Sequence, residues 1–241
     1  MARTITDYDV EMIVDSGATI VAELRKAVRT YGPEIKQELR AIDEARAFDP
    51  DYHAQRCFLI AITSPQTAFD KNVRAAKRIH EHLFEVFNTS DDVQDVLEGW
   101  GDDGYMGSTS QGRYILQSLQ YVRALTGKEC NWDSLWYARK AQRSIGVASK
   151  TIAFASALYN ARARVFTLDR WMLRGLLAHT GIEVTQGEEI TISPARYKTL
   201  QAFCLDCHDA ANVGKRPFVS QWALWNLYRG DTFQSHVIAF T

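Results

Sequence analysis

Two polar side chains in the middle of the chain have the types and the spacing of a nucleophile and its partner. Lys150 lies in the first turn of a helix predicted for residues 149–159, directly after a tight turn that contains Gly146. Asp169 follows nineteen residues later, where the next predicted helix begins. A lysine amine becomes nucleophilic when burial or positive neighbours lower its pKa, and a carboxylate can orient it, accept a proton or stabilise a cation. Because one helix and a short loop join them, we expect the two side chains to meet across a cleft.

The turn at Gly146 has the features of a phosphate-binding site. Backbone N–H groups in such a turn, together with the positive end of the following helix, attract an anion. Lys150 would then lie beside a bound nucleic-acid backbone. A lysine at a helix start and an aspartate at a helix cap also have ordinary structural roles, so the residues alone leave both interpretations open.

Residues 144–150, Ser-Ile-Gly-Val-Ala-Ser-Lys, resemble the hairpin of the helix-hairpin-helix DNA glycosylases, the superfamily of endonuclease III and 8-oxoguanine glycosylase. The family pattern reads Leu-Pro-Gly-Val/Ile-Gly-x-Lys, and Gly146, Val147 and Lys150 match it. Asp169 stands where the family carries an aspartate, about nineteen residues after the lysine. The hairpin and the aspartate therefore resemble the family in both order and separation.

A second segment, residues 58–67 (Phe-Leu-Ile-Ala-Ile-Thr-Ser-Pro-Gln-Thr), is similar to the same family. Gln66 occupies the place of a glutamine at the end of a buried helix. The resemblance spans roughly residues 58–177 and implies an all-α, two-lobed glycosylase-like fold with a helix-hairpin-helix motif. In this fold residues 1–241 form a single unit, with lobe A at about 1–67 plus 179–241 and the helix-hairpin-helix lobe B at about 68–178.

The resemblance also implies a function, which is excision of a base from DNA. Lys150 would be the Schiff-base nucleophile of a bifunctional glycosylase and Asp169 its catalytic partner. Gln66 could hydrogen-bond an orphaned base, or it could instead cap a helix. Tyr105 and Met106, in the glycine-rich stretch 101–112, could fill the gap left by a flipped nucleotide or could equally pack back onto the domain. The expected partner is therefore DNA, double-stranded and with one nucleotide flipped. The expected DNA contacts are Gly146, Ala148, Ser149, Gln66, Thr67, Tyr105, Met106, Arg113, Arg143 and Arg170.

Three departures from the family keep other functions open. Ile145 replaces its proline, Ala148 its second glycine, and Arg170-Trp171 the residues that follow the aspartate. The same fold could instead flip a base and modify it, as is suspected for viral enzymes that transfer amino acids or amines onto an activated thymine methyl group. A non-catalytic DNA-binding protein, with Lys150 as a phosphate contact, is a third possibility, and a structural protein without a nucleic-acid partner is a fourth.

The charges are distributed asymmetrically along the chain, although the formal net charge is only −1. Residues 81–109 carry eight acids and no Lys or Arg. Residues 110–180 carry three acids and eleven Lys or Arg, at positions 113, 123, 128, 139, 140, 143, 150, 162, 164, 170 and 174. A basic face centred on the hairpin would suit contact with phosphates, whereas chance clustering on a solvated helical surface is the alternative.

Hydrophobic periodicity predicts helices along almost the whole chain. Gly32-Pro33 is expected to separate a first helix, residues 7–31, from a second, 34–47, and a third helix contains Cys57 in a buried run. A brief extended piece is expected at 190–192. The remaining helices are predicted at about 70–87, 113–125, 131–143, 149–159, 166–179, 195–212 and 217–228.

Composition points to an ordinary globular protein with 46% hydrophobic and 24% charged residues. No apolar run is long enough to span a membrane and the start lacks a signal-peptide pattern, so a cytoplasmic, DNA-associated location is expected. Cys204, Cys207 and His208 are the only residues with metal-like spacing, and no second pair of ligands follows. We therefore expect no metal and no cofactor, and we see no sign of an obligatory protein partner.

Overall fold

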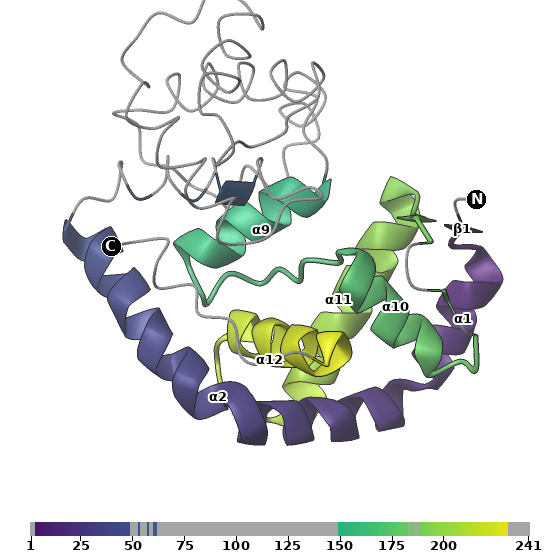
Figure 1. Ribbon diagram of the computed structural model, residues 1–241, viewed down its shortest axis with the longest axis horizontal. Coiled ribbons are helices and arrows are strands. Elements are labelled where there is room, and N and C mark those ends of the chain that lie inside the picture. Colours follow the sequence, from purple (N-terminus) through teal and green to yellow (C-terminus); the bar gives the residue numbers. More distant parts are fainter. Residues whose placement is uncertain are drawn as a thin grey trace, which may run out of the picture. The chain divides into compact units, whose positions relative to one another are not determined.

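The computed structural model describes residues 3–48, 53, 57, 60–61, 149–182, 184–185 and 188–230, without the side chains of residues 41, 42, 45, 46, 48 and 149. These residues form helices and one pair of very short strands (Figure 1). The predominance of helix confirms the predicted all-α class. The helices are α1 (Asp7–Asp15), α2 (Gly17–Phe48), α9 (Ser149–Tyr159), α10 (Arg170–Ala178), α11 (Pro194–Ala211) and α12 (Pro217–Arg229), and the strands are β1 (Arg3–Thr4) and β2 (Ile190–Thr191).

The chain divides into two compact units. The terminal unit comprises Met1–Arg40 and Asn160–Ser235, and the central unit comprises Ala41–Tyr159 and His236–Thr241. The lobe boundaries expected after residues 67 and 178 stay a prediction. Residues 160–178, which include Asp169, group with the terminal segments, whereas Lys150 belongs to the central unit.

Helix α2 passes through Gly32-Pro33 without a break, so the predicted separation of helices 7–31 and 34–47 is wrong. Pro33 is exposed, and the carbonyl that loses its partner there, on Arg29, also belongs to an exposed residue. Water can hydrate such a carbonyl, which limits the cost of the proline. The actual break lies earlier, at Ser16 between α1 and α2, where the Ser16 hydroxyl donates to the Met12 carbonyl at 2.9 Å.

The core of the terminal unit forms where α10, α11 and α12 pack together. Helix α12 packs on α10 and α11, and α1 packs on the same two helices (Figure 1). Helix α2 runs past the end of α11, where the Arg25 guanidinium donates to the carbonyls of Ala210 and Ala211. Among the residues that the structure describes, the largest fully buried side chains belong to this unit: Trp222, Phe166, Phe218, Ile5, Ile13, Ile20, Leu24, Ile35 and Leu39.

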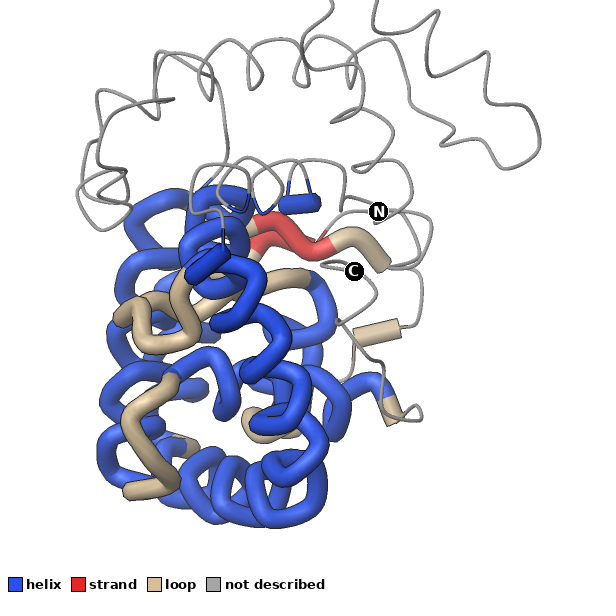
Figure 2. The backbone as a smooth tube through the Cα atoms, turned by 90° about the vertical axis from the view of Figure 1, so that its left-hand side faces the viewer, coloured by secondary structure: helices blue, strands red, loops and turns tan. Residues whose placement is uncertain are grey.

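The two strands tie the start of the chain to the segment before α11. β1 and β2 pair in parallel, with Arg3 opposite Ile190 and Thr4 opposite Thr191 (Figure 2). The expected extended piece at 190–192 is thus confirmed at its first two residues, whereas its partner β1 was not expected. A two-residue strand carries almost no pattern of its own, and it is the pairing that defines it.

Helix α9 begins and ends at the predicted residues, Ser149 and Tyr159. It is rich in alanine, and most of its side chains are buried in the central unit. Tyr159 lies beside the buried His53 ring, with 5.7 Å between the ring centroids, and His53 Nε2 lies 3.5 Å from Cys57 Sγ. Cys57 is fully buried, as the apolar run around it predicted.

We predict that Gly175→Ala destabilises the protein strongly. A Cβ at this position in α10 would overlap the ring of Tyr228 on α12, so the two helices would have to move apart. Overpacking of this kind costs about 1–3 kcal/mol, which urea unfolding would measure. Gly17→Ala is the control, because its Cβ would make an ordinary 3.4 Å contact with Phe203. Equal stability of the two variants would contradict the close approach of α10 and α12.

Candidate functional site

The segment that leads to Asp169 is extended, whereas we predicted a helix from residue 166. Helix α10 begins at Arg170, and Asp169 is its N-cap, with φ −87° and ψ −179°. The four residues 165–168 are buried, with at most 5% of each side chain exposed. Three of the four are apolar, and Thr167 is the exception. Asp169 therefore lies just before the helix and not within its first turn.

Side chains from α11 and α12 bond the buried backbone of this segment. Gln221 Oε1 accepts from the Thr167 amide at 2.6 Å, and Gln201 Nε2 donates to the Phe166 carbonyl at 3.0 Å. The Tyr197 hydroxyl accepts from the Leu168 amide at 3.1 Å and donates to the Phe166 carbonyl at 3.4 Å. Burial raises the pKa of Tyr197, so its hydroxyl keeps the proton that it donates. These bonds satisfy backbone groups that would otherwise be buried without partners.

The Asp169 carboxylate is held by three N–H donors. Oδ1 accepts from the amides of Trp171 and Met172 at 3.0 and 2.9 Å, which is the N-cap interaction of α10. Oδ2 accepts from the Trp225 indole Nε1 at 3.0 Å. A carboxylate oxygen can accept about two hydrogen bonds. Oδ1 has its full complement from described residues, and Oδ2 retains one acceptor position, so Oδ2 is the atom suited to chemistry.

Sequence reasoning missed the role of Trp225. Trp222, Trp225 and Tyr228 recur at helical spacing, a pattern that more often indicates core residues than a functional surface. Trp222 follows that expectation and is buried, but Trp225 is only partly buried and bonds Asp169. The single signal in the sequence was a tryptophan in a stripe of aromatic residues, which does not reveal its partner 56 residues away.

Arginine and tryptophan side chains cluster next to Asp169. The guanidinium carbons of Arg170, Arg174 and Arg229 lie 5.7, 5.1 and 5.7 Å from the Trp171 ring centroid, within the range of cation–π attraction. Arg229 also lies 4.5 Å from the Trp225 ring. Arg174 donates to the Glu188 carbonyl at 2.7 Å, and Arg170 is exposed. We call these five residues, Arg170, Arg174, Arg229, Trp171 and Trp225, the arginine–tryptophan cluster.

The other predicted site residues are described less fully. Lys150 is the second residue of α9, in its first turn as predicted, and its side chain is half-buried in the central unit. Ser149 is the first residue of that helix. Because Lys150 and Asp169 belong to different units, their meeting across a cleft stays a prediction. The remaining predicted contacts, Gly146, Ala148, Gln66, Thr67, Tyr105, Met106, Arg113 and Arg143, lie outside the described residues.

The residues with metal-like spacing lie in the interior of the terminal unit. Cys204, Cys207 and His208 are all buried on α11. Burial raises the pKa of the Cys204 thiol, and raises the pKa of Cys207 to about 11, so both thiols are protonated at neutral pH. Within the part of the chain that the structure describes, no three His, Cys, Asp or Glu side chains are grouped so that they could hold a metal ion.

Comparison with known proteins gives the fold but no close relative. No protein-family model matches the sequence, and no curated protein matches it. The 8-oxoguanine DNA glycosylase of Thermotoga maritima superposes with a TM-score of 0.66 over 90% of this chain and 100% of its own, at 17% identity. The 8-oxoguanine DNA glycosylase of Methanocaldococcus jannaschii superposes with the same TM-score over 90% of this chain and 97% of its own, at 14% identity.

These similarities confirm the predicted fold, which is the all-helical fold of the two DNA glycosylases. At such low identity they establish nothing finer than the fold. Among the helices that the structure describes, none combines the length and the apolar character needed to cross a membrane.

We predict that the cap at Asp169 is a measurable part of stability. Asp169→Ala removes the Oδ1 acceptor of α10, a change that typically costs about 1 kcal/mol. Asp169→Asn keeps a capping oxygen and loses only the bond from Trp225, so it should cost less. Urea unfolding of both variants checks the order. An Ala variant as stable as the Asn variant would show that the carboxylate does not cap α10 in solution.

Proposed function

We propose that this protein is a DNA glycosylase with lyase activity, in which Lys150 is the nucleophile and Asp169 its partner. The observation that carries the proposal is the fold shared with two DNA glycosylases, together with a lysine in the first turn of α9 and an aspartate that caps the next helix. The spacing of the two residues is also that of the helix-hairpin-helix glycosylases, which the hairpin sequence resembles.

In this proposal Asp169 acts through Oδ2. Oδ1 is engaged by the backbone of its own helix, which fixes the orientation of the carboxylate before DNA binds. Trp225 fixes the second oxygen from one side and leaves an acceptor position on the other. That position can take a proton from the Lys150 ammonium. Once this proton has passed to the leaving base, the restored carboxylate can stabilise the cationic sugar.

The proposed reaction has two chemical stages. The lone pair of Lys150 Nζ forms a bond to C1′ of the deoxyribose, the glycosidic bond breaks, and the base leaves with the bonding electrons and takes up a proton. The nitrogen then forms an imine with C1′ as the sugar ring opens. Loss of a proton from C2′ allows β-elimination, in which the bond from C3′ to the phosphate oxygen breaks and the strand is cut.

The arginine–tryptophan cluster gives this site a positive surface for DNA. Cation–π attraction to Trp171 holds three guanidinium groups together despite their mutual repulsion. Arginine binds phosphate through its planar fork of N–H donors. In the proposal Arg170, which is exposed, contacts a phosphate next to the flipped nucleotide.

Borohydride trapping tests the proposal directly, because it reduces the imine to a stable protein–DNA adduct. We expect an adduct with duplexes that carry an abasic site or 8-oxoguanine, none with Lys150→Gln, and full yield with Lys198→Gln, a lysine on α11. Asp169→Asn should remain folded and release base about 10²- to 10⁴-fold more slowly, the usual effect of losing a general base.

Two tests can overturn the proposed chemistry. If Lys150→Gln gives as much trapped adduct as the unchanged protein, Lys150 is not the nucleophile. The second test is mass spectrometry of nucleosides from DNA exposed to the protein, because excision yields free base. Heavier nucleosides with no free base would indicate base modification, and binding without either product would indicate a non-catalytic DNA-binding protein.

A further inference from the structure

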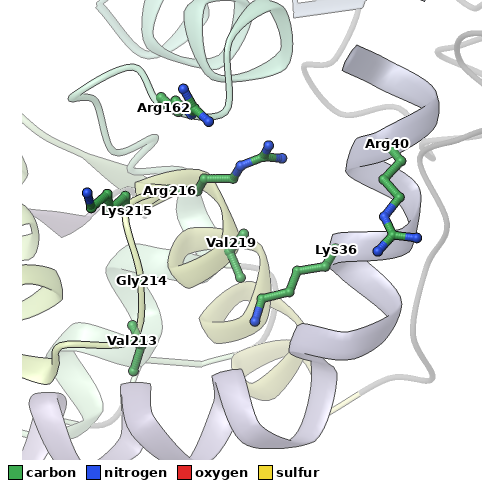
Figure 3. A pocket seen from close by; sticks show the side chains of 8 residues that line it. All are labelled: Lys36, Arg40, Arg162, Val213, Gly214, Lys215, Arg216 and Val219. Atoms are coloured by element: carbon green, nitrogen blue, oxygen red, sulfur yellow. The ribbon is translucent and has the colours of Figure 1, made fainter. Parts of the chain in front are cut away.

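A pocket of about 340 Å³ in the terminal unit has a strongly basic lining. It lies between the second half of α2, the turn at residues 160–164 and the loop at 212–216 that joins α11 to α12 (Figure 3). Its lining consists of five cationic residues and three small or apolar ones, and none of the described lining residues is acidic. They are Lys36, Arg40, Arg162, Lys215 and Arg216, with Val213, Gly214 and Val219.

The loop on one side of the pocket is fixed by the fold. Gly214 has φ +130°, a conformation that side-chain-bearing residues rarely adopt, and Asn212 is left-handed with φ +51°. The buried His208 imidazole bonds the backbone of Gly214, and its Nδ1 lies 2.7 Å from the Ser220 hydroxyl oxygen. His208 on α11 and Ser220 on α12 thus hold the loop, so this wall of the pocket is already formed without a ligand.

The cationic side chains reach the pocket from both sides. Lys36 extends from α2 toward Val219, and Arg216 extends from the loop toward α2. Lys215 points the other way, away from α2 (Figure 3). Arg40 follows Lys36 by one helical turn, a spacing at which like charges repel. Asp209, the carboxylate at the end of α11, is engaged by Arg164 in two hydrogen bonds of 3.0 and 2.7 Å.

The pocket therefore concentrates positive charge in a concave site, which raises the local concentration of anions. Arg216 is the N-cap of α12, so the positive end of the macrodipole of this helix lies at the pocket. The Arg216 side chain makes no capping bond. The small lining residues Gly214 and Val219 leave room for an oxyanion between the charges. Arginine and lysine together are the residues that bind phosphate in proteins.

We propose that this pocket binds phosphate groups of the DNA backbone. The proposal rests on the function proposed above, since it takes DNA as the ligand. The pocket contains neither Lys150 nor Asp169, so it contributes affinity and orientation but no chemistry. It gives the terminal unit a DNA contact of its own, separate from the hairpin of the central unit.

The dependence of DNA binding on salt tests the pocket. The double variant Lys36→Gln/Arg40→Gln removes two exposed charges of the pocket, and Lys26→Gln/Arg29→Gln removes two exposed charges of the same helix outside it. Binding of a double-stranded oligonucleotide is measured by fluorescence anisotropy over a range of NaCl concentrations. We expect the slope of log K against log[NaCl] to become less steep by about 1.8 in the pocket variant, at about 0.9 for each lost phosphate contact, and to stay unchanged in the control.

A second arm separates backbone phosphate from free phosphate. Tripolyphosphate is titrated into the unchanged protein and the pocket variant by calorimetry. An unchanged salt slope for DNA overturns the proposal, and if tripolyphosphate binding is then lost in the variant, the pocket serves a free phosphate ligand. Borohydride trapping at saturating DNA is run in parallel. A less steep salt slope without any trapped adduct would support the pocket and reject the glycosylase chemistry. A trapped adduct with an unchanged salt slope would support the chemistry and reject the pocket.

Discussion

The placement of Asp169 depends on a buried stretch of backbone that is neither helix nor sheet. Residues 165–168 cross the interior of the terminal unit, where water cannot hydrate their amides and carbonyls. Tyr197, Gln201 and Gln221 supply the missing hydrogen bonds from two different helices. Losing one partner would leave a buried polar group unsatisfied, at a cost of about 1–3 kcal/mol. The packing of α11 and α12 thereby determines where α10 begins.

The same arrangement couples stability to the proposed chemistry. The Asp169 carboxylate caps α10 with Oδ1 and receives the indole N–H of Trp225 on Oδ2. A side chain held by three donors loses little further freedom when it acts on a substrate, which is the benefit of a preorganised group. Gly175 allows α12 to come close enough to α10 for this contact, because any larger residue would meet Tyr228.

Charge in the terminal unit is organised locally, although the net charge of the whole chain is only −1. Some cations are neutralised by carboxylates, as in the Arg196–Asp7 and Arg3–Asp9 pairs at 2.7 Å. Others gather around tryptophan rings near Asp169 or line the pocket beside α2. Pairs of the first kind join segments of the fold, whereas the gathered cations place several positive charges close together at these two places.

Local sequence determined the bounds of three of the six described helices. Helix α9 lies at its predicted residues, and α11 and α12 differ by only one residue at each displaced end, since apolar periodicity and capping residues act over a few positions. The sequence also proposes Lys150 and Asp169 as site residues, because their spacing matches a family pattern, and their roles stay a prediction. The proline in α2 misled the prediction, because its tolerance depends on which face of the helix is exposed.

Tertiary structure alone decided the partners. Trp225 bonds Asp169 across 56 residues, and the start of α10 follows from side chains on two later helices. The pocket joins Lys36 to Arg216 from opposite ends of the chain, and neither residue stood out in the sequence. Contacts of this kind arise from how helices pack, which no periodicity within a single helix encodes. The sequence thus determined the elements and the chemical groups, and their packing decided which groups share a site.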